Sequence, residues 1–183
     1  LQLNLTFFLM SGRWFIDVLF YSPCASPPFL LFIYIVSEKF KIKRKNMKEF
    51  YQIESYPIGD CFRTCLASIM ESDNLEDIPN FMKDGEQFFE SNFNKWLIEN
   101  GYLDITFEIN NSKLLGKNFN GQLCILTGVD SITKIAHSVV GRVDYREKNN
   151  SLHYSEIHNP SLNGNTENID FLFCTFVAKR LDI

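Results

Sequence analysis

GDCFRTCLASIM, residues 59–70, sets a glycine and a cysteine directly before an apolar run. The apolar residues have the spacing of one helical face, with members at 62, 65, 66, 69 and 70. We expect Gly59 to permit a sharp turn into this helix. Cys61 then lies at or next to the helix N-terminus, where free backbone N–H groups and the helix dipole lower a thiol pKa. A thiolate is a nucleophile, so Cys61 is a candidate for covalent catalysis.

A second cysteine follows one helical turn later. Cys65 falls on the apolar face, and we expect it to be a small buried core residue. Cys61 can be interpreted in the same way. This stretch alone therefore leaves a core cysteine and a catalytic cysteine both open at position 61, and the partners of Cys61 must decide.

Composition and charge limit the possible partners. The 183 residues are 45% hydrophobic and 15% aromatic, enough to bury the core of one domain. Residues 47–183 carry 12 basic and 20 acidic side chains, a net charge of −8, without a basic patch after Lys48. We therefore expect no nucleic-acid partner and no anionic membrane surface. Five cysteines at irregular spacing form no disulfide framework, which predicts free thiols in a reducing, cytoplasmic compartment.

Residues 1–46 differ from the rest, with apolar residues and three prolines in no helical or strand period. A membrane anchor over residues 15–36 is the alternative interpretation, but its continuous apolar run of eight residues is far shorter than the about 20 that a span needs. We interpret residues 1–46 as an extension outside the domain, translated from sequence upstream of a true start at Met47. Residues 43–47, KRKNM, can be encoded by an A-rich stretch with AGGA shortly before an ATG, as a bacterial ribosome-binding site requires. The domain is then 47–183.

The order of predicted elements favours an α+β fold. Residues 75–81 favour a short helical turn or an ordered loop, and a helix from 84 or 85 to 100 should end at Gly101. This helix carries an apolar stripe that we expect in the core: Phe88, Phe89, Phe93, Trp96 and Leu97. Beyond Gly101 the period becomes two, which predicts strands at 102–109, 122–127, 136–145, 151–157 and 171–177. We expect the helices to pack on one side of an antiparallel meander.

Two further residues complete a candidate site. His137 opens the strand at 136–145 and can stand at a sheet end facing Cys61, either as a core histidine or as a catalytic base. The next strand ends before Asn159, and antiparallel pairing would return Asn159 to the level of His137. Asn159 could then accept the second ring N–H of His137 and fix its tautomer. Because Asn159 precedes a proline, it is also a plausible turn residue.

These motifs, with the acidic LEDIPNF at 75–81, resemble the compact papain-like cysteine peptidases. The resemblance is nearest to the peptidases that process bacteriocin leaders and to phage and bacterial relatives, and it covers about residues 50–162. It implies a papain-like fold and a triad in which Cys61 is the nucleophile, His137 the base and Asn159 the orienting residue. It also implies an oxyanion hole formed by the Cys61 N–H and an upstream glutamine. Gln52 is the candidate, although it lies nine residues before Cys61, further than is usual in the family.

The implied activity is hydrolysis of a peptide or other amide bond through a thioester, with a peptide or protein substrate and no cofactor. An inactive papain-fold binding or regulatory module is the main alternative. A metal site formed by Cys61, Cys65 and His137 is disfavoured, because Cys65 should face the core and no fourth ligand has a suitable spacing.

A chain that begins at Met47 should remain soluble and unfold cooperatively, because residues 1–46 are expected to add nothing to the core. Thermal unfolding followed by circular dichroism measures this directly. Aggregation of the shortened chain, or the loss of its transition, would contradict the domain boundary.

Overall fold

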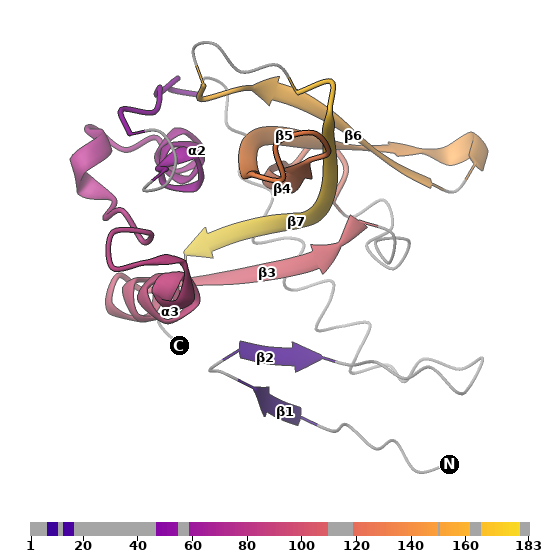
Figure 1. Ribbon diagram of the computed structural model, residues 1–183. Coiled ribbons are helices and arrows are strands. Elements are labelled where there is room, and N and C mark those ends of the chain that lie inside the picture. The colour runs from indigo at the N-terminus through magenta and orange to yellow at the C-terminus, as the bar shows by residue number, and fades with distance from the viewer. Residues whose placement is uncertain are drawn as a thin grey trace.

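The computed structural model describes residues 7–10, 13–16, 47–54, 59–109, 119–149, 151–161 and 166–179. This part of the chain is α+β, with helices followed by a five-stranded antiparallel sheet (Figure 1). The helical elements are α2 (Cys61–Met70), η1 (Leu75–Asp77), η2 (Glu86–Phe88), α3 (Phe89–Glu99) and η4 (Glu147–Asn149). The strands of this sheet are β3 (Tyr102–Glu108), β4 (Leu123–Asp130), β5 (Ala136–Arg146), β6 (Ser151–His158) and β7 (Ile169–Lys179).

Helix α2 begins at Cys61, which agrees with the predicted start. Its inner face is fully buried and includes Cys65 and Leu66, so the prediction of Cys65 as a core residue is confirmed. The expected role of Gly59 is wrong, because this glycine does not have a positive φ. A Cβ added at Gly59 meets nothing within 4 Å, so the turn before α2 does not require glycine.

Helix α3 ends as predicted. Gly101 follows it with φ of 70°, and its N–H bonds to the Ile98 carbonyl at 3.3 Å, which is typical of a glycine that ends a helix. Of the predicted apolar stripe, Phe93 and Leu97 are buried in the core. Phe88 is 48% exposed, so its assignment to the core is wrong. The residue belongs to η2, whose tighter winding takes it out of the register of the α3 face.

The strands have the order β3-β7-β4-β5-β6, so the predicted simple meander is wrong in one respect. The last strand, β7, inserts between β3 and β4 and is antiparallel to both. Residues 174–178 of β7 are all buried. Such an uninterrupted buried run is typical of a central strand that is covered on both faces.

Two hydrophobic clusters cover opposite faces of the sheet. The first joins α2, η1 and α3 to Ile125, Val140 and Val177. The second packs the other face and contains Leu126, Val139 and Phe176. Neighbouring residues of β4 and β5 therefore point into different clusters, as the strand period of two requires. Both helices lie to the same side of the sheet in Figure 1.

Strand β5 extends beyond its partner β6. The pairing of these two strands ends at Val140 opposite His158, with a bulge between Val140 and Gly141. Residues 136–139 of β5 thus pair with β4 on one edge and have no β6 partner on the other. Helix α2 packs against this part of β5, where the Cys65 thiol lies 3.4 Å from the Ser138 carbonyl oxygen.

Strands β1 (Phe7–Met10) and β2 (Arg13–Ile16) pair with each other in a separate antiparallel sheet. The sequence of residues 1–46 shows no strand period, yet these two short segments pair as strands. Both segments are rich in aromatic and aliphatic residues, which favour strands even without regular alternation. The proposed membrane anchor at 15–36 lies almost entirely outside the described residues. Within the described ranges, none of the helices combines the length and the apolar character that crossing a bilayer requires.

Gly128 lies opposite His137 in the β4–β5 pair, next to the register shift between β4 and β7. A Cβ at this position would lie 2.2 Å from the Asp170 carbonyl oxygen, so Gly128→Ala must displace backbone. We expect a loss of about 1–3 kcal/mol in the free energy of unfolding. Urea unfolding checks this, with Gly59→Ala as the matched control that should change it by less than about 0.5 kcal/mol. Equal stability of the two variants would contradict the close approach.

Candidate active site

His137 and Asn159 are joined directly. The His137 Nε2 atom lies 3.0 Å from Asn159 Oδ1, across 22 residues of sequence. Because the amide oxygen can only accept, Nε2 carries a proton in this bond, and Nδ1 is the ring nitrogen that Asn159 leaves available. The antiparallel pairing of β5 and β6 brings these residues to the same level, as predicted.

Asn159 also acts as a turn residue. Its Oδ1 atom accepts a second hydrogen bond, from the Ser161 N–H at 3.0 Å. This bond closes an Asx turn at the point where the chain leaves β6. Both contacts that the sequence suggested for Asn159 are therefore present, since the same amide oxygen closes the turn and bonds to His137.

Cys61 lies beside the same end of β5. The amide and hydroxyl of Ser138, the residue that follows His137, lie close enough to the Cys61 sulfur to favour its ionised form. The Ser138 hydroxyl is itself held 2.9 Å from Thr127 Oγ1 on β4. Among the hydrogen bonds of the described residues, none links Cys61 directly to His137. The structure thus places the nucleophile candidate near Ser138, the residue after His137 in β5.

Burial raises the pKa of the Cys61 thiol above its ordinary value, because removal from water disfavours the thiolate. The Ser138 amide, the Phe62 amide and the Ser138 hydroxyl oppose this shift, whereas the negative charge of Asp60 adds to it. The predicted lowering of this pKa is therefore wrong. The helix N-terminus does act in the predicted direction through the Phe62 amide, but desolvation outweighs it.

Gln52 lies in a segment, residues 50–54, that passes between the other parts of the site. Its N–H bonds to the Pro160 carbonyl at 3.0 Å, directly after Asn159. The next two residues, Ile53 and Glu54, bond through their N–H groups to Asp60. The backbone of Gln52 is thus fixed between the residues that follow Asn159 and those that precede Cys61, despite the long spacing in sequence.

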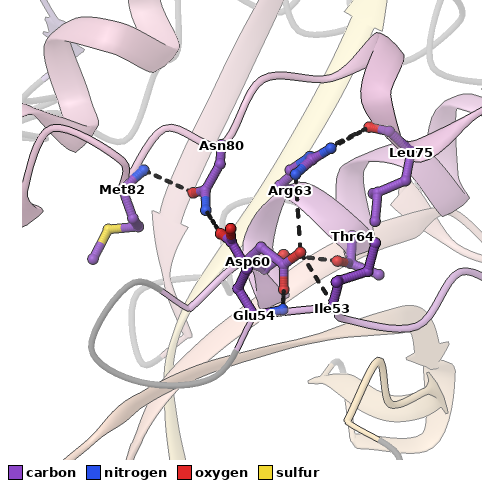
Figure 2. Close-up of polar contacts among 8 residues, drawn as sticks. All are labelled: Ile53, Glu54, Asp60, Arg63, Thr64, Leu75, Asn80 and Met82. Atoms are coloured by element: carbon purple, nitrogen blue, oxygen red, sulfur yellow. Dashed lines mark hydrogen bonds and ion pairs between the residues drawn. The ribbon is translucent and has the colours of Figure 1, made fainter.

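Two residues that hold the 50–54 segment were missed by sequence analysis. His158, which is buried, lies with Nε2 2.6 Å from the Phe50 carbonyl oxygen and packs edge-on against Tyr51. Asp60, which is 1% exposed, accepts the two N–H groups of Ile53 and Glu54 (Figure 2). In the sequence, only their positions directly before Asn159 and Cys61 pointed to a role for His158 and Asp60. Their partners are backbone groups, which leave no pattern of side chains to recognise.

Comparison with known proteins identified no relative of this chain. No family model matches the chain, and no curated protein and no solved structure is significantly similar to it. The site must therefore be judged by its own geometry. Within the described ranges, no group of three or more His, Cys, Asp or Glu side chains is arranged to hold a metal ion.

Alkylation by iodoacetamide should distinguish Cys61 from Cys65. Cys61 is partly exposed, whereas Cys65 has no exposed surface, so Cys61 should react first. Because burial raises the Cys61 pKa, its rate should rise with pH and continue to rise above about pH 8.5, the ordinary thiol value. Trypsin cleaves after Arg63 and separates the two cysteines for mass spectrometry. A rate that levels off below pH 7, or earlier reaction of Cys65, would contradict this environment.

Proposed function

We propose that the chain is a cysteine hydrolase of papain-like type that cleaves a peptide or other amide bond. The observation that carries the proposal is the hydrogen bond between His137 Nε2 and Asn159 Oδ1, made one residue away from the Ser138 groups that contact the Cys61 sulfur. A cysteine, a base and a group that orients the base are the parts that nucleophilic acyl transfer requires.

The proposed reaction begins with proton transfer. His137 Nδ1 takes the Cys61 proton as the sulfur attacks the carbonyl carbon of the substrate. The negative charge that develops on the carbonyl oxygen is stabilised by the Cys61 N–H and by the Gln52 side chain. His137 then protonates the leaving amine, and a thioester remains on Cys61. Water, activated by His137, hydrolyses this thioester and restores the thiol.

The role of Asn159 follows from its acceptor. By holding the Nε2 proton, it keeps the Nδ1 lone pair available and supports the ring when it becomes positively charged. The raised Cys61 pKa fits a mechanism in which the thiolate forms only during attack. The hydrogen bond from Cys61 to His137 would form with substrate, since catalytic hydrogen bonds are often long in the free enzyme.

One observation favours the second candidate function, an inactive binding or regulatory module of the same fold. A largely desolvated cysteine with a raised pKa, which no hydrogen bond among the described residues joins to His137, is what such a module would retain. The two functions differ in one measurable property. A hydrolase forms a covalent acyl intermediate on Cys61 with an activated ester, and an inactive module does not.

The test uses p-nitrophenyl acetate as the acyl donor. Release of p-nitrophenol should be accompanied by acetylation of Cys61, seen by intact mass, and Cys61→Ser should lose thioester formation while melting at nearly the same temperature. Asn159→Ala should slow turnover by about 10-fold or more, because the His137 tautomer is no longer fixed.

The matched control for Asn159 is Asn120→Ala. Asn120 Oδ1 also accepts a backbone N–H, from Tyr145 at 2.8 Å, so this substitution should affect stability without affecting turnover. If Asn159→Ala and Asn120→Ala retained equal turnover, Asn159 would be a turn residue only. If wild-type protein gave no acetylated Cys61, the hydrolase proposal would be overturned in favour of the inactive module.

A further inference from the structure

Asp60 lies directly before helix α2 but does not cap it with its side chain. An aspartate there ordinarily caps the helix by accepting an N–H of the first turn. Asp60 makes no such side-chain bond. Its carboxylate turns instead to the 50–54 segment, with Oδ2 3.3 Å from the Ile53 N–H nitrogen and Oδ1 3.3 Å from that of Glu54. Both oxygens of a buried carboxylate thus bind one short stretch of backbone (Figure 2).

An uncharged side chain could fill the position of Asp60 at a lower cost in folding free energy. Burial raises the pKa of the Asp60 carboxyl, so an ionised group at this position costs stability at neutral pH. The N–H groups of Ile53 and Glu54 offset part of that cost, and Arg63 contributes from 4.0 Å. Arg63 is itself fixed by the Leu75 carbonyl, at 3.0 Å from Nη2. A charged group that is retained at a cost in stability suggests a role beyond packing.

Asp60 connects Cys61 with the segment that contains Gln52. It is bonded through the chain to Cys61, and through its side chain to the two residues that follow Gln52. On the other side of Gln52, the backbone N–H is held by Pro160. Loss of the Asp60 carboxylate would remove two of the bonds on the cysteine side and leave the Asp60 N–H on the Glu54 carbonyl at 3.4 Å and Asn80 on the Glu54 carboxylate at 2.6 Å. Gln52 would then stay near Asn159 but be held less firmly relative to Cys61.

We infer that Asp60 is a positioning residue that sets Gln52 in place relative to the Cys61 N–H, so that both donors can reach one oxyanion. The inference rests on the proposed hydrolase function. Asp60 acts through Gln52 and touches no reacting atom. Its negative charge opposes thiolate formation at Cys61, so its contribution is confined to reactions that develop an oxyanion.

The experiment compares two reactions of the same sulfur. Acetylation of Cys61 by p-nitrophenyl acetate passes through a tetrahedral oxyanion, whereas alkylation by iodoacetamide forms none. Asp60→Asn should slow acetylation by about 100- to 1,000-fold, the range expected when one oxyanion donor is lost. Alkylation at the same pH should stay the same or become faster, because a negative charge near the thiol has been removed. A general loosening of the fold would change both rates in the same direction.

A double-mutant cycle tests the route through Gln52. Gln52→Ala should cause a loss of acetylation similar to that of Asp60→Asn, and the double variant should lose little more, because the two residues act as one unit. Asp77→Ala is the matched control. Asp77 also accepts a backbone N–H at a helix start, from Asn74 at 2.9 Å, but does not bind the 50–54 segment.

The outcomes separate the two proposals. If wild-type protein is not acetylated on Cys61, the hydrolase proposal fails and the role of Asp60 fails with it. If Cys61 is acetylated but Asp60→Asn reacts at the wild-type rate, or if its effect adds fully to that of Gln52→Ala, only the positioning role is overturned. Thermal melting accompanies each variant. Asp60→Asn is used because the amide has nearly the same shape as the carboxylate, so the variant is expected to fold.

Discussion

The free edge of β5 at Ser138 is the constraint on which the site depends. Strand β6 stops pairing at His158, opposite Val140, so the peptide groups of Ser138 need other partners. They find them in α2, where the Cys65 thiol lies against the Ser138 carbonyl and the Ser138 amide contacts the Cys61 sulfur. The length difference between two strands thus leaves Ser138 free to bind the helix that carries Cys61.

The same strand end explains why the other half of the site lies close by. Because β6 ends at His158, the chain turns at Asn159, and the Asx turn aims the amide oxygen at the His137 ring. His158, the residue before this turn, is held in place by its hydrogen bond with the Phe50 carbonyl. The described site is therefore fastened mainly by bonds between side chains and backbone, which depend little on exposed ion pairs. Such bonds are not screened by salt as surface pairs are.

Sequence analysis predicted those parts of the fold that follow from local pattern. Hydrophobic period gave the strand positions, and the antiparallel return from β5 brought Asn159 to His137 as expected. The insertion of β7 between β3 and β4 was missed, because strand order depends on long-range packing and leaves no mark on local alternation. The Cys61 pKa was wrong in direction because the helix end is visible in sequence, whereas the burial that outweighs it is not. The contacts of Asp60 were invisible because its partners are backbone N–H groups.

The buried polar residues of α2 complete the argument about how Gln52 is held. Thr64 Oγ1 donates to the Asp60 carbonyl at 2.8 Å, and Ser68 Oγ donates to the Thr64 carbonyl at 3.0 Å. The Ser68 hydroxyl also accepts the Phe50 N–H, at 3.2 Å. A helix designed only for packing would carry alanine at such positions, since buried hydroxyls contribute little unless they are satisfied. Here both hydroxyls are satisfied, and Ser68 binds the first residue of the 50–54 segment. Helix α2 therefore binds the start of this segment through Ser68, and Asp60, the residue before the helix, binds its end at Ile53 and Glu54. Gln52 lies between these two points of attachment.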